Sequence, residues 1–179
     1  MGIIFNRNIV SLNSIELLFV EDSYNFPRPI LAATVGSIYS SEELHLYNVH
    51  LKCCDGAINQ ERRATALSQI KEMLDLNYPS ENIVVAGDFN ENLSQDPQSI
   101  FFDFLGDINY HFTDLDIAYG DPSLWSYPSY PSHLDHILIS NELFDNLTGV
   151  ESVLLENCLE NYLSDISDHR PLMISLLMK

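Results

Sequence analysis

Residues 83–86 (IVVA) form a short, entirely apolar run, and this run constrains the fold more than any other feature. A strand without a polar side needs an apolar layer on both faces of its sheet. The preceding segment, residues 59–76, has helical spacing, with Leu67, Ile70 and Leu74 on one face. We place its polar residues on the surface: Arg62, Arg63, Gln69 and Lys71. A buried strand after an amphipathic helix indicates a layered α/β or α+β domain.

Further strands are expected on both sides of this unit. Runs of β-branched and aromatic residues predict strands at residues 30–39, 44–51, 137–139 and 172–178. Residues 2–10 and 15–20 are typical of a hairpin, and Asp96–Pro97 of a helix start before Phe101. Because no repeat or linker divides the 179 residues, we expect one domain over residues 1–179.

The chain is strongly acidic, with 26 Asp and Glu against 8 Lys and Arg and a formal net charge of −18. Residues 72–169 contain no Lys or Arg but 19 of the acidic residues. This charge argues against an unaided basic surface for duplex DNA or an anionic membrane. Such a segment needs metal ions or a few polar groups to approach a phosphate. No run approaches the roughly 20 apolar residues of a membrane helix.

The cysteines do not make a disulfide framework. Cys53 and Cys54 are adjacent, which disfavours a bridge between them, and Cys158 makes the count odd. The N-terminus lacks the cationic start and cleavage site of a signal peptide. The sequence leaves localisation open, and for the chain as given it favours the reducing cytoplasm.

Four polar clusters lie at or beyond the ends of predicted strands, where loops on a rigid scaffold carry function. In the first, NVHLK, His50 either donates a hydrogen bond to a phosphate oxygen or is an ordinary interior histidine. In the second, GDFN, Gly87 permits a tight turn. Asp88 and Asn90 there either cap their own backbone or face one pocket, where a carboxylate can bind a metal or take a proton from water.

The other two clusters come later in the chain. Residues 124–140 (LWSYPSYPSHLDHILIS) carry a stiff aromatic loop, which can stack a base or pack on the surface. Asp135 precedes an apolar strand and needs a hydrogen-bonded partner, for which a histidine is the nearest candidate. In SDHRPL, Asp168 and His169 alternate sides, so one can bind a cation while the other faces a substrate. A pair of this kind by itself usually carries no function.

Taken together, NVHLK, a helix with Arg and Gln, GDFN, LDHILIS and SDHRPL resemble the endonuclease/exonuclease/phosphatase superfamily in order and spacing. The resemblance runs from Gly2 along essentially the whole chain. It implies a four-layer α/β sandwich of the deoxyribonuclease-like type. It also implies hydrolysis of a phosphoester by in-line attack of water, dependent on a divalent metal, Mg²⁺ or Mn²⁺.

The resemblance assigns a role to each matching residue. Asp88 would accept the proton of the attacking water or orient that water, and Asn90 would hold the water or the phosphate. Asp168 would be a metal ligand. His169 would contact the phosphate, held by a bond from Asp135 that fixes its tautomer and raises its pKa.

His50 would be the second histidine on the phosphate. The substrate would be a phosphodiester of nucleic acid, a lipid head group or a small molecule. The charge of the chain does not favour nucleic acid, and it tilts the choice slightly toward a small or lipid head-group phosphodiester.

The sequence departs from the family pattern at the N-terminus. Family members have a strand with an Asn and then a strand ending in Gln-Glu, whose glutamate is a principal metal ligand; Glu16 and Glu21 lie in a different context. The chain resembles the C-terminal two-thirds of a family domain and is N-terminally incomplete in that sense. We expect uncovered apolar surface and association through an exposed half-sheet. The alternative function is a catalytically silent domain that acts by binding.

A second departure is His133, which stands where many family members place Arg or Gln. This difference weakens any basic substrate contact at that position.

Overall fold

The computed structural model describes residues 1–39 and 41–178. Its strands form a six-stranded sheet in the order β1-β2-β3-β4-β6-β5 and a two-stranded sheet, β7-β8. The strands are β1 (Val10–Leu18), β2 (Ile30–Ser37), β3 (Glu43–His50), β4 (Ile83–Asp88), β5 (Tyr110–Phe112), β6 (Asp135–Ser140), β7 (Leu147–Ser152) and β8 (Leu172–Leu176). Strands β3 and β4 are parallel, and the other pairs are antiparallel.

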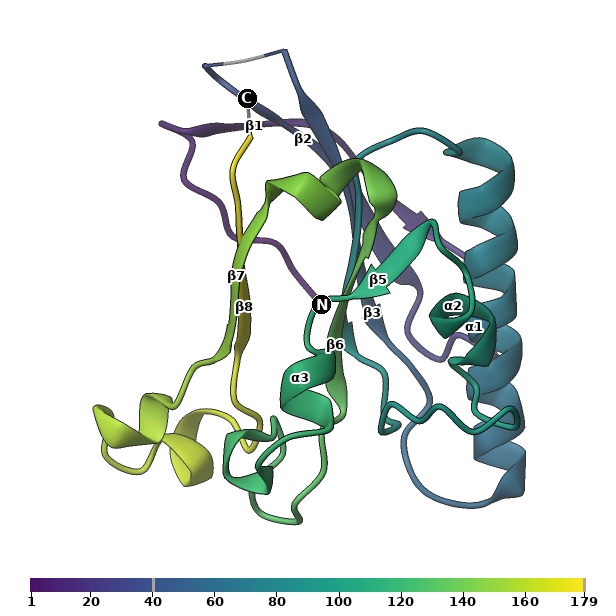
Figure 1. Ribbon diagram of the computed structural model, residues 1–179, viewed down its shortest axis with the longest axis vertical. Helices are drawn as coiled ribbons and strands as arrows, with labels where there is room; N and C mark the ends of the chain where they lie inside the picture. Colours follow the sequence, from purple (N-terminus) through teal and green to yellow (C-terminus); the bar gives the residue numbers. More distant parts are fainter. Residues whose placement is uncertain (40, 179) are drawn as a thin grey trace.

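Helices and the small sheet cover opposite faces of the large sheet. Helix α1 (Ala57–Asn77) connects β3 to β4 and lies with α2 (Phe102–Leu105) on one face, while β7 and β8 lie on the other (Figure 1). The short helix α3 (Leu115–Ala118) stands near one end of β6. This arrangement confirms the α/β class and the deoxyribonuclease-like fold. Of the four layers expected, the described residues supply one helical layer and the two sheets.

Strand β4 is buried on both faces, as its apolar sequence predicts. Ile83 and Val85 belong to the core beneath α1, together with Leu67, Ile70 and Leu74 of that helix. Val84 and Ala86 point the other way, into a second core under β7-β8. That second core also contains Ile137, Ile139, Leu172, Ile174 and Leu176. The two cores hold β3, β4 and β6 rigidly between them, and the candidate site lies at the ends of these strands.

Some predicted boundaries are wrong. Residues 10–18 form one continuous strand rather than a hairpin of residues 2–10 and 15–20, because a bulge between Leu12 and Ser14 absorbs the extra residue. The helix expected to start at Asp96 begins only at Phe102. Asp96 instead accepts the backbone N–H of Gln98 in a local turn. Strands β5 and β7 were not predicted.

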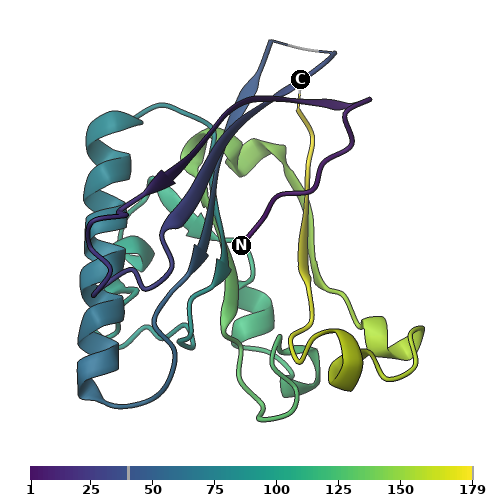
Figure 2. The same cartoon turned by 180° about the vertical axis from the view of Figure 1, so that it is seen from behind.

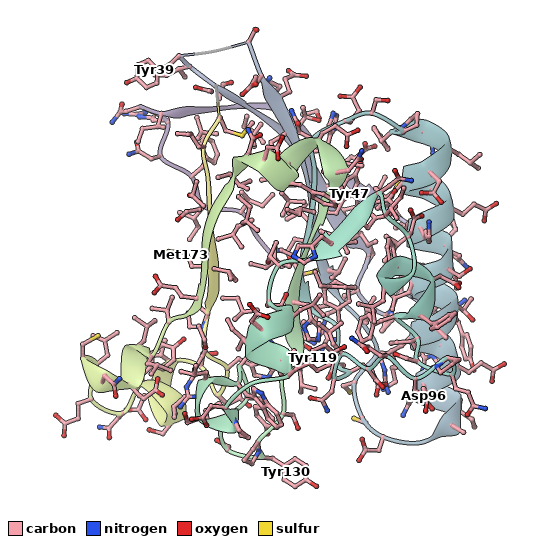
Figure 3. The ribbon with its side chains drawn as sticks, in the orientation of Figure 1. Tyr39, Tyr47, Asp96, Tyr119, Tyr130 and Met173 are labelled. Carbon is pink, nitrogen blue, oxygen red and sulfur yellow. The ribbon has the colours of Figure 1, made fainter. Side chains whose placement is uncertain are left out.

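The edge of the large sheet exposes apolar side chains. Strand β1 is an edge strand of this sheet (Figure 2), and its Ile15 and Leu17 are 54% and 53% exposed. In the small sheet, Met173 on β8, labelled in Figure 3, is 45% exposed. The uncovered apolar surface expected from the sequence is therefore present. Association through it stays a prediction. Within the described residues, no helix is long and apolar enough to cross a membrane.

Candidate active site

Strand pairing brings three of the predicted site residues into one row. The register of parallel β3 and β4 sets His50 beside Asp88, and the register of antiparallel β4 and β6 sets Asp88 beside Asp135. His169, in the segment before β8, comes to the same place from the small sheet. The row lies at the end of the molecule that carries Tyr130, opposite the end that carries Tyr39 (Figure 3).

The distances show a compact group. His169 Nδ1 and Asp135 Oδ2 are 2.6 Å apart, a short charge-assisted hydrogen bond. His50 Nε2 lies 3.4 Å from Asp88 Oδ2. Ligand atoms of Asp88, Asp135 and His169 all lie within 4.8 Å of one another. Loops from three separate parts of the chain therefore converge on a space about the size of one phosphate or one ion.

The site separates the proton affinities of its members. The hydrogen bond that His169 donates to Asp135 raises the pKa of His169 and so favours its cationic form. Burial lowers the pKa of His50 despite Asp88 beside it. Burial therefore disfavours the charged form of His50, although Asp88 Oδ2 lies only 3.4 Å from its Nε2. Burial, and then the charge of Asp135, raise the pKa of Asp88.

The backbone around GDFN has special geometry. Gly87 lies inside β4 with φ +141°, so the tight turn expected of it is wrong. A Cβ at Gly87 would meet the carbonyl oxygen of Val49 at 2.0 Å, so glycine is needed for the close approach of β3 and β4. Asn90 has φ +54°; its N–H donates to Asp88 Oδ1 at 2.8 Å and its Nδ2 to the carbonyl of Leu51 at 3.1 Å. Asp88 thus caps its own turn with one oxygen and faces His50 with the other.

Asp168 and the aromatic loop border the cluster. Asp168 is exposed and does not belong to the group of three ligand residues, although its charge contributes to the raised pKa of His169. The ring of Tyr127 packs on His169, with centroids 4.9 Å apart and planes tilted by 35°. The aromatic loop therefore contacts the site through Tyr127, while Tyr130 is exposed.

Arg63 is buried, which corrects its expected surface position. Its guanidinium donates to Glu91 Oε2 at 2.6 and 3.1 Å and to the carbonyls of Lys52 and Cys54 at 2.9 and 3.0 Å. It thereby ties the loop after β3 to the loop after β4. Helical spacing could not reveal this role, because the partners are distant in sequence.

The carboxylates of Asp88 and Asp135 fit a divalent cation, with His169 bonded to Asp135 beside them. Carboxylate oxygens are the preferred ligands of Mg²⁺ and Mn²⁺. The repulsion between the two carboxylates, which contributes to the raised pKa of Asp88, would be relieved by a cation between them. Neither Glu16 nor Glu21 belongs to a cluster of ligating side chains among the described residues.

A model of the endonuclease/exonuclease/phosphatase family matches residues 5–169. The chain belongs to this family. A search of curated proteins finds no significant match.

Solved structures of family type share the fold. A TDP2 from D. rerio, complexed with single-strand DNA product, has 15% identity and a TM-score of 0.69, over 96% of this chain and 70% of that one. The 3′ phosphatase NExo from Neisseria, bound to a product DNA hairpin, has 18% identity and a TM-score of 0.60, over 94% and 72%. A mannosyl-6-phosphatase of Bacteroides thetaiotaomicron has 13% identity and a TM-score of 0.62, over 97% and 69%. The family and these neighbours support phosphoester hydrolysis in general terms.

Proposed function

We propose that this chain, as one domain over residues 1–179, hydrolyses a phosphoester with the help of Mg²⁺ or Mn²⁺. The observation that carries the proposal is the row His50–Asp88–Asp135 with His169 bonded to its last member. Two carboxylates and a cationic imidazole within one ion's reach can hold a metal and a phosphate together. A divalent cation, when bound there, supplies positive charge at the phosphate oxygens.

The residues divide the remaining work. Asp88, with its raised pKa, accepts a proton from the attacking water. His50, whose Nε2 lies 3.4 Å from Asp88 Oδ2, orients the carboxylate of Asp88 and donates to a phosphate oxygen. The amide of Asn90, anchored on Leu51, holds the water or the phosphate.

The opposite side of the site balances charge on the phosphate. Asp135 fixes the tautomer of His169, whose other nitrogen, Nε2, donates to the phosphate as charge develops. Asp168, exposed beside His169, would be a further metal ligand.

The substrate class follows from charge. Because residues 72–169 lack Lys and Arg, we favour a small or lipid head-group phosphodiester over a long nucleic acid. The DNA products bound by two structural neighbours keep a nucleic-acid end among the substrates to test. The second candidate function is a catalytically silent binding domain. It is favoured by the lack of a glutamate in the described ligand group.

The test measures hydrolysis of bis(p-nitrophenyl) phosphate, p-nitrophenyl phosphate and a 3′-phosphorylated oligonucleotide with Mg²⁺, Mn²⁺ or EDTA. We expect metal-dependent turnover that falls by about 100-fold or more in His169→Ala and Asp88→Asn. The matched control is His45→Ala. His45 lies on the same strand as His50, but it contacts Thr34 and Glu81 instead of the site.

Calorimetric titration with Mn²⁺ separates the two candidate functions. Stoichiometric binding that is lost in Asp88→Asn supports the enzyme. Turnover unchanged in His169→Ala, or no metal-dependent hydrolysis of any of these substrates, would contradict it and leave the binding domain.

A further inference from the structure

A second cluster of titratable side chains lies behind the candidate site. Asp114, His133 and His136, here called the buried triad, have side chains that are 0%, 1% and 0% exposed. Their ligand atoms all lie within 4.8 Å of one another, so by composition they could form a metal site. None of them received a role from the sequence, and His133 is too deeply buried to touch a substrate.

The hydrogen bonds of the triad leave no nitrogen lone pair for a metal. The N–H of Ser126 donates to His133 Nδ1 at 3.1 Å, so the ring proton is on Nε2, which lies 3.0 Å from Asp114 Oδ2. His136 faces acceptors with both nitrogens, Asp114 Oδ2 at 2.7 Å and the carbonyl of Glu91 at 2.9 Å. Neither nitrogen of His136 is therefore free to hold a metal.

The carboxylate of the triad is fully satisfied. Besides the two histidines on Oδ2, Asp114 Oδ1 accepts the N–H of Ile137 at 2.9 Å. Burial opposes the ionisation of Asp114, but the hydrogen bonds from His133 and His136 prevail and lower its pKa. The triad is a closed unit in which every ring nitrogen and both carboxylate oxygens have partners. A unit of this kind suits a structural purpose.

One arm of the triad reaches Asp135 and His169. The backbone N–H of Ser126 donates to His133 Nδ1. The Oγ of Ser126 accepts hydrogen bonds from the backbone N–H groups of Leu134 and Asp135, both at 3.1 Å. Its carbonyl accepts the N–H of Arg170, next to His169, at 2.7 Å. Both members of the Asp135–His169 pair are thus held through Ser126.

The other arm reaches the loop that carries Asp88 and Asn90. The ring of His136 holds the carbonyl of Glu91 through Nε2 at 2.9 Å. The backbone N–H of His133 donates to Asn92 Oδ1 at 2.7 Å. Glu91 and Asn92 directly follow Asn90 in sequence. The triad is therefore hydrogen-bonded to the chain on both sides of the site, to Ser126 on one side and to Glu91 and Asn92 on the other.

We propose that the buried triad is a positioning device, which fixes the segments carrying Asp88, Asp135 and His169 without touching the substrate. The inference builds on the proposed site. Its test reads geometry by NMR and needs no turnover, so the proposed function and the positioning role can fail separately.

The test uses the isotope-labelled full chain and four variants. His133→Leu removes the acceptor for Ser126 and the donor to Asp114, while His133→Gln keeps a donor to Asp114. Asp114→Asn replaces the shared acceptor. The matched control is Ser140→Ala, a buried hydroxyl at the opposite end of β6 that bonds the N–H of Ile83 and the carbonyl of Glu81.

Amide hydrogen exchange and the low-field proton signal of His169 Nδ1 are the readouts. In His133→Leu and Asp114→Asn, exchange at Leu134, Asp135 and Arg170 should rise by about tenfold, and the His169 signal should broaden or shift. His133→Gln should restore most of the protection. Ser140→Ala should affect the amide of Ile83 instead.

Two results would overturn the proposal. One is unchanged protection and an unchanged His169 signal in His133→Leu. The other is equal loosening of the site amides in Ser140→Ala, because that would indicate only a global loss of stability. If Asp114→Asn does not fold, the contrast between the Leu and Gln variants at position 133 decides the matter.

Discussion

Gly87→Ala tests how closely β3 and β4 must approach to build the candidate site. Gly87 has φ +141°, and a Cβ placed there would lie 2.0 Å from the carbonyl oxygen of Val49. Real Cβ atoms essentially never come closer than 3.0 Å, so the strands would have to separate by about 1 Å. The next residue is Asp88, which pairs with His50 across the same two strands.

The expected cost has two parts. The backbone conformation costs an L residue about 1–3 kcal/mol. Overpacking against a backbone atom that cannot rotate away costs about 1–3 kcal/mol more. We therefore expect Gly87→Ala to lower the free energy of unfolding by about 2–6 kcal/mol.

Urea denaturation followed by circular dichroism measures this difference. The matched control is Gly149→Ala in β7, where the added Cβ would be 4.0 Å from Ser175 Cβ and φ is not positive. That change should be neutral or stabilising by up to about 1 kcal/mol, because glycine is a poor strand residue.

The prediction is refuted if Gly87→Ala lowers the free energy of unfolding by less than about 1 kcal/mol, or by no more than Gly149→Ala does. Either result would mean that β3 and β4 have room which the structure does not show. The row of site residues would then not depend on close strand contact.

Three further predictions concern the site. Asp135→Asn should lower the pKa of His169 toward its ordinary value of about 6.5, which NMR titration would detect; an unchanged pKa would show that Asp135 is not the cause. Arg63→Met should lower the free energy of unfolding by about 3 kcal/mol. Arg62→Met, at the neighbouring and more exposed position, should lower it by only about 0–1 kcal/mol, as measured by denaturation. Equal costs would contradict a buried role for Arg63. Because the folded-state pKa of His169 is raised, its stabilisation is complete below about pH 6.5 and is lost as pH rises through the folded pKa. For His50, whose folded-state pKa is lowered, stability is lost as pH falls below about 6.5. From pH 5 to 9, the stability of the wild-type chain relative to His169→Gln should fall, and its stability relative to His50→Gln should rise.

Local sequence signals predicted the central elements well. The helix of residues 59–76 and the strand of residues 83–86 are present as α1 and β4, because apolar periodicity reports directly which face a segment buries. Boundaries were less reliable: the bulge at Leu12 and Ser14 has no local signature, so one long strand was interpreted as two. Strand β7 depends on its partner β8 for its conformation.

The candidate site was predictable as a set of residues and, for the bond between Asp135 and His169, as one contact, whereas its other contacts were not predicted. Motif order pointed to Asp135 and His169, and the structure brings them to 2.6 Å. Arg63 and Asp114 went unrecognised, because a buried charge is defined by its partners. These partners, Glu91 for Arg63 and His136 for Asp114, are 28 and 22 positions away in sequence.

The amino-acid sequence by itself determined the layered fold, the family and which side chains supply oxygen and nitrogen at the strand ends. These properties follow from apolar spacing and residue type, which act over a few positions. Only the tertiary structure decided that His50, Asp88 and Asp135 stand in one row. It also decided that Asp114, His133 and His136 form the buried triad that positions the site. Strand register and burial set those relations, and both depend on contacts between distant parts of the chain.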